Sequence, residues 1–156
     1  MIKFVFLIVS TLSTVACQSA PDPISVRVYP AVLAADAGAM ATAWDSVVFE
    51  GSPRAAAGTY CIAPEPLFTE WNIIAFHPAQ QPDGQVALTV RLNAYGARRL
   101  GRFTAEPENQ KKPLGVRIDG EWVDFFPVLT RLDNSITLYG FTQAQAQALR
   151  TYLDSK

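Results

Sequence analysis

Hydrophobic and polar residues alternate along several stretches of the chain, most clearly in its second half. The clearest run has an apolar residue at every second position, Val86, Leu88, Val90 and Leu92. A period of two is typical of a strand with one buried face. Apolar positions then recur at helical spacing over residues 94–104, and Asn93 is a suitable N-cap for that helix. The pattern therefore predicts a strand followed by a helix.

Two more alternating runs, at residues 114–118 and 122–126, flank the dipeptide Asp119-Gly120. Asp-Gly between apolar runs is a strong signal for a tight β-hairpin. A further strand at residues 136–139 precedes a last helix, at whose start Thr142 and Gln145 form a capping-box pair. This order predicts a β-α-β-β-β-α unit. The expected fold class is α+β, an antiparallel sheet with helices packed on one face.

The first half gives weaker signals. A strand from Ile24 to Val28 should end at Pro30, because proline removes a ladder donor. Residues 31–44 are compatible with a short helix, and residues 72–77 with a strand before the Asp83-Gly84 turn. Three arginines of the predicted helix, Arg98, Arg99 and Arg102, fall away from its apolar side and are interpreted as a solvated face.

Residues 1–16 predict a signal peptide. A single early charge, Lys3, precedes an apolar run over residues 4–12 that is too short for a comfortable bilayer-spanning helix. The following Thr14-Val-Ala-Cys17 resembles a bacterial lipobox, in which the cysteine is acylated and becomes the mature N-terminus. Thr14 departs from the usual leucine. The alternative is ordinary cleavage after Ala16 that leaves Cys17 free.

Residues 17–23 then predict a short linker to a lipid, and residues 24–156 a single domain. Gln18 follows the cysteine where aspartate would resemble the inner-membrane retention signal, so by analogy the anchor belongs in the outer membrane. The predicted location is the bacterial periplasm, with membrane attachment through Cys17. A formal net charge of -1 and the absence of a basic patch in the sequence argue against a nucleic-acid partner.

Residues suited to catalysis are few. With Cys17 acylated, Cys61 is interpreted as a buried strand residue, although a Cys17–Cys61 disulfide is the competing possibility. His77 is the only histidine and has no metal ligand at suitable spacing. The acidic residues near the hairpin, Asp119, Glu121 and Asp124, are all expected to face solvent. We therefore predict no enzyme activity, no catalytic residues, no metal and no cofactor.

The turns and core positions between residues 60 and 153 resemble the head of the first periplasmic region of the protein-export membrane protein SecD. The matching segments are Pro64–Glu70, Val90–Leu92, Gly96-Ala97, Phe103-Thr104, Leu114–Gly120, Pro127-Val128 and Gly140–Thr142. The resemblance implies a stand-alone SecD-head-like domain, without the membrane spans in which the family's proton-driven chemistry resides. It also implies binding of polypeptide near an export channel, although fold alone does not establish function.

Two functions from different classes follow. One is a non-catalytic envelope lipoprotein whose SecD-head-like domain binds polypeptide or a partner protein. The other is a structural accessory subunit of an envelope membrane complex. If the apolar positions of the strands face the helices, Arg91, Arg117 and Tyr139 should collect on the open face of one sheet. Arginine and tyrosine combine apolar area, stacking and hydrogen-bond donors, so these three residues are candidates for protein binding. An ordinary solvated sheet face is the alternative.

Overall fold

The computed structural model describes residues 23–156, so the predicted signal peptide and Cys17 lie outside the described residues. Nine strands form two antiparallel sheets. The first sheet has the order β2-β3-β1-β7-β8, with β4 also paired to β1, and the second has the order β5-β6-β9. The strands of the first sheet are β1 (Val26–Leu33), β2 (Asp45–Phe49), β3 (Gly58–Ile62), β4 (Phe68–Thr69), β7 (Pro113–Ile118) and β8 (Glu121–Pro127). Those of the second are β5 (Ile73–Gln80), β6 (Val86–Leu92) and β9 (Ser135–Phe141).

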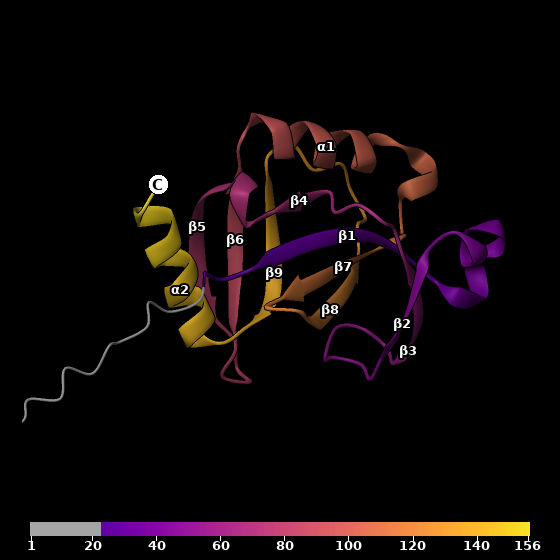
Figure 1. Cartoon of the computed structure of the whole chain (residues 1–156), viewed down its shortest axis with the longest axis horizontal. Helices are drawn as coiled ribbons and strands as arrows, with labels where there is room; N and C mark the ends of the chain where they lie inside the picture. The colour runs from indigo at the N-terminus through magenta and orange to yellow at the C-terminus, as the bar shows by residue number, and fades with distance from the viewer. Residues whose placement is uncertain (1–22) are drawn as a thin grey trace, which may run out of the picture.

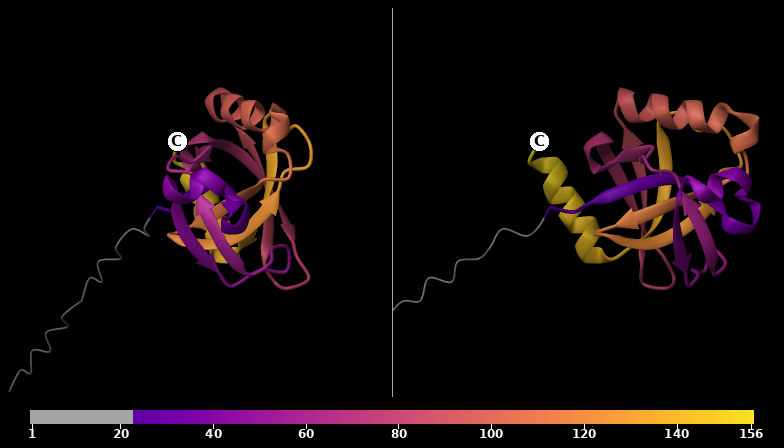
Figure 2. Two further views of the ribbon diagram at one scale, coloured as in Figure 1. Left: turned by 90° about the vertical axis from the view of Figure 1, so that its right-hand side faces the viewer. Right: turned by 45° about the vertical axis from the view of Figure 1, so that its right-hand side comes forward.

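The two sheets face each other with their strands crossing. In Figure 1, β1 runs across the upright strands of the second sheet, α1 lies over one end of those strands, and α2 lies beside β5. The α-helices are α1 (Ala94–Ala105) and α2 (Gln143–Asp154). The short 3₁₀ helices are η1 (Ala34–Asp36), η2 (Gly38–Thr42), η3 (Glu70–Asn72) and η4 (Pro107–Asn109). In the left view of Figure 2, no helix of the described residues lies beyond the outer face of the second sheet.

The predicted β-α-β-β-β-α order is confirmed as β6-α1-β7-β8-β9-α2, and the α+β class with antiparallel sheets is confirmed with it. The strands do not, however, form one sheet. The hairpin β7-β8 pairs with β1, whereas β6 and β9 pair with each other. Alternation identifies the buried face of a strand but not its neighbour, so the pairing of β7 with β1, which puts the hairpin in a separate sheet, could not be inferred.

The local signals around these elements are confirmed in detail. The Asn93 side chain accepts a hydrogen bond from the Gly96 N–H, and Thr142 and Gln145 form the capping box of α2. Asp119 and Gly120 have φ values of 49° and 92°, the positive values that a type I′ hairpin turn requires. β-Branched residues resist positive φ, so Asp119 and Gly120 suit these two turn positions. The turn places Ile118 opposite Glu121 and thereby sets the register of the hairpin.

Strand β1 continues past Pro30 to Leu33, so the prediction that it ends at Pro30 is wrong. One edge of β1 pairs first with β4, at Arg27 and Val28, and then with β3, from Ala31 onwards. Pro30 falls at the junction of these two pairings, where a missing donor is tolerated. The short helix expected in residues 31–44 is replaced by the end of β1 and by η1 and η2.

The two sheets enclose cores of different composition. The main core lies between them and is mainly aliphatic, with Val28, Leu88 and Leu138 among its fully buried members, but it also contains Phe68 and Phe141. A second cluster, the aromatic core, lies where β1, β3 and β8 meet. Its members are Tyr29, Ala31, Phe49, Tyr60, Ile62 and Phe125, with Trp122 packed against them. Cys61 is buried as predicted, in a small third cluster with Val32 and Ala37.

Candidate protein-binding site

Two of the three predicted binding residues belong to the second sheet. Arg91 is exposed on β6 and lies opposite Ser135 of β9. Tyr139 is four residues further along β9, so the alternation of the strand places it on the same outer face. Between them, the hydroxyl groups of Thr89 and Thr137 form a hydrogen bond of 2.9 Å across the two strands. This outer face is polar, in contrast to the buried side chains of Leu88 and Val90 on the inner face.

Arg117 does not share this face. It lies on β7 in the first sheet, where its Nε donates to the Gly120 carbonyl at 2.7 Å and its guanidinium is 5.7 Å from the centre of the Trp122 ring. The prediction that the three residues collect on one sheet face is therefore wrong. The error follows directly from the pairing of β7 with β1 and β8.

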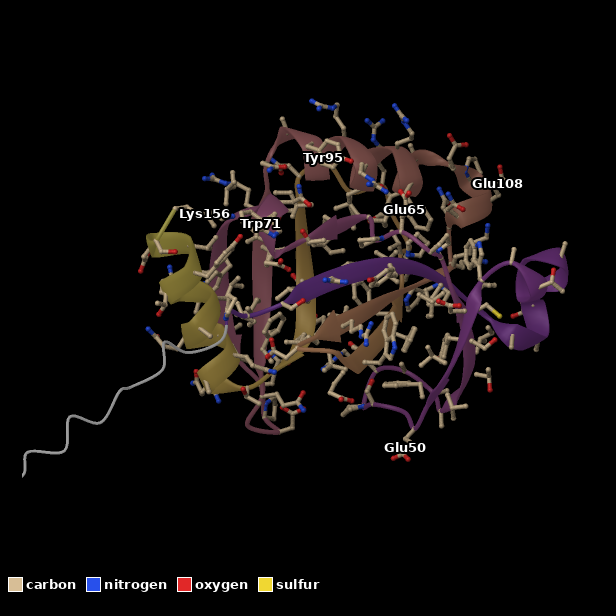
Figure 3. The ribbon with its side chains drawn as sticks, viewed as in Figure 1. Glu50, Glu65, Trp71, Tyr95, Glu108 and Lys156 are labelled. Carbon is tan, nitrogen blue, oxygen red and sulfur yellow. The ribbon has the colours of Figure 1, made fainter. Side chains whose placement is uncertain are left out.

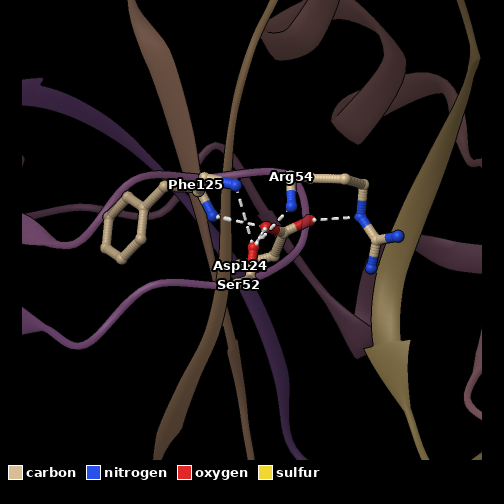
Figure 4. Close-up of polar contacts among 5 residues, drawn as sticks. Ser52, Arg54, Asp124 and Phe125 are labelled. Carbon is tan, nitrogen blue, oxygen red and sulfur yellow. Dashed lines mark hydrogen bonds and ion pairs between the residues drawn. The ribbon is translucent and has the colours of Figure 1, made fainter. Parts of the chain in front are cut away.

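A residue that the sequence did not indicate stacks on one face of the Tyr139 ring. The guanidinium of Arg54, from the loop between β2 and β3, lies 4.0 Å from the centre of the Tyr139 ring. The Arg54 Nε also donates to Asp124 Oδ2 at 3.1 Å (Figure 4). Residues 51–58 are typical of a loop, but nothing in the sequence connects Arg54 to Asp124, which is 70 residues further along the chain, or to Tyr139.

Asp124 is wholly buried, which corrects the expectation that it faces solvent. Its Oδ1 accepts hydrogen bonds from Ser52 Oγ at 2.7 Å and from the Phe125 N–H at 3.0 Å. The cause is a β-bulge. Val116 lies opposite Asp124 and Arg117 opposite Trp122, so Val123 is an extra residue and the alternation of β8 shifts. Asp119 and Glu121, before the bulge, are exposed as expected.

The buried Asp124 also influences a neighbouring tyrosine. Tyr60 donates its hydroxyl to the Ala56 carbonyl at 3.0 Å inside the aromatic core. Burial raises the pKa of the Tyr60 hydroxyl above its usual value, and the negative charge of Asp124 raises it further. Asp124 and Arg54 form an ion pair that holds the loop between β2 and β3 against β8, and the same guanidinium contacts Tyr139 of the second sheet.

An apolar groove runs beside β9. It has a volume of about 370 Å³ and is formed by the end of β8, the loop that follows it and the strand β9 itself. Among the side chains that line this groove are Phe126, Leu129, Thr137 and Tyr139. Leu129 is 68% exposed beside this groove.

The edge of β9 that borders this groove is unpaired. Within residues 23–156, β9 forms a ladder with β6 and with no other strand. At Gly140 the edge is closed by Val123 of β8, since a Cβ on Gly140 would lie 2.8 Å from the Val123 Cβ. The stretch from Ser135 to Tyr139 is therefore the open part of this edge, about the length of a short strand.

The other residues considered for metal binding or catalysis do not lie together in one site among the described residues. His77 is exposed on β5, and the described residues contain no group of three or more side chains placed to hold a metal ion. On α1, Arg99 interacts with Glu65 at 3.5 Å and with the Tyr95 hydroxyl at 3.1 Å, whereas Arg98 and Arg102 are exposed. Among residues 23–156, no helix has the length and apolar character needed to span a bilayer.

The fold and this groove define an α+β domain with two crossed sheets and one open strand edge. Comparison with solved structures finds the same fold in SecDF. One structure, of a membrane component SecDF that enhances protein export, matches with a TM-score of 0.54 and 13% identity over 85% of this chain and 63% of that chain. A second, of SecDF in a super-membrane-facing form, gives 0.53 and 13% over 83% of this chain and 19% of that chain.

The predicted resemblance to the SecD head is thus confirmed at the level of fold. The matched part is wider than residues 60–153, because it covers 85% of the chain. The chain spans 63% of the length of the first of these structures, so the activity of the whole neighbour does not transfer with the fold. No protein-family model and no curated protein match the sequence.

Proposed function

We propose that this protein is a non-catalytic envelope lipoprotein whose SecD-head-like domain binds extended polypeptide. The observation that carries the proposal is the open edge of β9 beside an apolar groove. An unpaired edge offers a row of backbone N–H and C=O groups, and a neighbouring groove accepts alternate side chains of the added segment. Backbone pairing gives affinity for many sequences, as a protein that contacts exported chains requires.

The other edge of the second sheet makes a useful comparison. β5 is also an edge strand, but it contains Pro78, which cannot donate to an added strand. The sequence of β9, Ser-Ile-Thr-Leu-Tyr-Gly-Phe, contains neither proline nor lysine, the residues that commonly protect an edge. The molecule therefore protects one edge of this sheet and leaves the other open.

The candidates from the sequence fit this proposal unequally. Tyr139 lines the groove and would contact the bound segment directly. Arg91 lies on the adjacent outer face, near the Ser135 end of the open edge. Arg117 has no part in the proposed site, because it belongs to the other sheet. A catalytic use of Asp124 is disfavoured by its three hydrogen-bond partners and complete burial.

The compartment and the class of ligand are supported by the sequence and by the neighbour's fold. The signal peptide predicted at residues 1–16 and the lipobox-like Cys17 support export and a lipid anchor, with the outer membrane as the proposed location. The protein of similar fold is a membrane component that enhances protein export. Polypeptide in the periplasm is therefore the ligand that we propose.

The test uses a permanently unfolded polypeptide of known identity, fluorescently labelled reduced and carboxymethylated lactalbumin, titrated with the purified full chain. Leu129→Asp places a charge in the groove at a position that is already exposed, so the fold should be retained. Because an unpaired charge in an apolar contact is costly, we expect the Kd to rise about tenfold. Fluorescence anisotropy gives the Kd.

Val48→Asp is the matched control. Val48 is 78% exposed on β2, away from the groove, so the same chemical change there should leave the Kd unaltered. Equal binding by the Leu129→Asp variant and the original chain would refute the proposed site. If the unfolded probe does not bind, while a photocrosslinking residue at position 129 captures one folded partner at constant stoichiometry, the accessory-subunit function is supported instead.

A further inference from the structure

The described chain starts at one end of the molecule, beside α2 (Figure 1). Two carboxylates fix this starting point. Asp119 Oδ1 accepts from the Ser25 N–H at 3.0 Å, and Glu70 Oε2 accepts from the Val26 N–H at 2.9 Å. The Asp119 N–H also donates to the Ser25 carbonyl at 2.9 Å. The first residues of the domain are therefore held at a defined position on its surface, close to Pro23.

An aromatic and cationic cluster lies at the same end, with Trp71 and Lys156 close together in Figure 3. Trp71 is 69% exposed, and its ring meets that of Tyr152 edge to face at 5.9 Å. The Lys156 Nζ is 4.5 Å from the centre of the Tyr152 ring and donates to the Trp71 carbonyl at 3.3 Å. We call this surface, with Pro23, the tether end.

Further apolar surface adjoins the cluster. A shallow groove of about 470 Å³ separates Pro23 and Ile24 from α2, and Ala144, Ala148 and Tyr152 line it. Ile74, three residues beyond Trp71, is 50% exposed at the bulge of β5. Because the side chains of Trp71 and Ile74 are largely exposed, they contribute little buried apolar area to the main core. Trp71 and Ile74 are therefore available to a surface outside the domain.

The distance from the proposed anchor limits what that surface can be. Six residue steps separate Cys17 from Pro23, which corresponds to at most about 20 Å of fully extended chain. A domain held at this distance presents its tether end to the bilayer, with η1, η2 and β2 at the far end of its long axis. Tryptophan, tyrosine and lysine together are the side chains typical of the membrane–water interface.

We infer that the tether end docks on the bilayer surface, with Trp71 at the level of the lipid headgroups. This inference rests on the lipid anchor of the proposed function. The occupant is the bilayer itself and not a protein. The cationic Arg150 and Lys156 are outnumbered by the carboxylates of Asp154, Glu70 and Asp119, so the tether end carries no net positive charge. Docking therefore depends on partition of the aromatic side chain and not on attraction to anionic lipid.

The test uses the acylated full chain reconstituted in vesicles of phosphatidylethanolamine and phosphatidylglycerol with brominated acyl chains. Bromine quenches only tryptophan that reaches the bilayer. We expect marked quenching for the original chain, and at least a twofold loss of that quenching in Trp71→Phe. The matched control is Trp44→Phe, since Trp44 follows η2 at the opposite end and its removal should preserve the quenching.

The outcomes separate the docking from the anchor. If intact mass shows acylation and the protein floats with the vesicles, but the original chain is not quenched, the docking is refuted and the anchor stands. If the protein is not acylated and does not float, the anchor fails and the docking fails with it. Quenching that survives replacement of phosphatidylglycerol by phosphatidylcholine supports interfacial partition, whereas a strict requirement for phosphatidylglycerol overturns it.

Discussion

The main core and the aromatic core solve the same packing problem in different ways. The main core fills the space between two sheets mainly with aliphatic side chains from β1, β6, β7, β9 and both α-helices, together with two phenylalanines, Phe68 and Phe141. The aromatic core is much smaller and uses ring contacts. Phe125 lies at its centre, stacked on Tyr60 at 4.0 Å and on Trp122 at 5.4 Å. Large rings supply much buried area from few residues, which suits a small cluster.

The two cores also differ in their polar content. Asp124 lies beside the aromatic core, where Ser52 and Arg54 satisfy its carboxylate. The main core contains no comparable charge among the described residues, and its buried polar member is Thr104, whose hydroxyl bonds to the Leu100 carbonyl at 3.0 Å. The ion pair does more than stabilise, because it also places Arg54 on Tyr139 of the proposed groove. The aromatic core thus supports the proposed site, while the main core supports the fold.

Phe125→Ala should have the largest effect on this comparison. Removing a fully buried phenylalanine typically lowers the free energy of unfolding by about 3–5 kcal/mol. If the aromatic core is a separate unit, amide exchange should accelerate most in β2 and β3 and least in β6. Hydrogen exchange measured by mass spectrometry or nuclear magnetic resonance distinguishes these strands.

Leu138→Ala is the counterpart in the main core. Leu138 is fully buried on β9, and its truncation should cost about 2–5 kcal/mol and accelerate exchange in both sheets. If Phe125→Ala also accelerates amide exchange evenly throughout the molecule, the proposed independence of the two cores is contradicted. In that case the two cores form one cooperative unit.

Asp124→Asn tests the polar anchor with a smaller expected loss. The amide keeps the size of the carboxylate but loses the ionic hydrogen bond with Arg54. Hydrogen bonds to charged groups contribute about 1.5–3 kcal/mol, and Arg54 retains some contact with water, so we expect a loss of about 1–3 kcal/mol. Urea denaturation gives the change in the free energy of unfolding.

Asp133→Asn is the matched control, because Asp133 forms an ion pair of 3.5 Å with Arg131 that is largely exposed. Exposed pairs contribute little, so this variant should differ from the original chain by less than about 1 kcal/mol. Equal effects at positions 124 and 133 would mean that the buried pair adds nothing to the stability of the aromatic core.

The same division explains what the sequence could predict. Signals that act within a few residues were correctly interpreted, such as the positive φ pair at Asp119-Gly120 and the capping box at Thr142. Burial on β6 also followed the alternation from Leu88 onwards, with Thr89 and Arg91 exposed and Val90 buried, although Ala87 is buried as well. These features belong mainly to the elements around the main core, where each strand or helix has a regular pattern of its own.

The aromatic core and the candidate site depend on contacts between distant segments. The bulge at Val123 buries Asp124, and no sequence pattern in β8 indicates that this strand has an extra residue relative to β7. Arg54 contacts Tyr139 from a segment whose sequence is typical only of a loop. The groove beside β9 exists because β8 pairs with β7 and not with β9. Such features follow from sheet order, which local periodicity does not determine.

Tyr60→Phe gives the smallest expected effect and probes the electrostatics of the aromatic core. At neutral pH the variant loses the hydrogen bond to Ala56, a cost of about 0.5–1.5 kcal/mol. Burial, and then the charge of Asp124, raise the pKa of Tyr60 in the folded protein above the value of about 10 in the unfolded chain. The folded state therefore holds this proton more tightly. The stability that the proton confers is complete below pH 10 and is lost as the pH rises through the folded pKa.

The difference in unfolding free energy between the original chain and Tyr60→Phe should accordingly shrink above pH 10. Its slope cannot exceed about 1.4 kcal/mol per pH unit, the limit for one proton. Urea denaturation from pH 8 to alkaline pH measures the difference, and tyrosinate absorbance of the urea-unfolded chain supplies the reference titration. A difference that stays constant across this range would show that Tyr60 ionises with equal ease in both states, and the proposed influence of the buried Asp124 on the aromatic core would have to be abandoned.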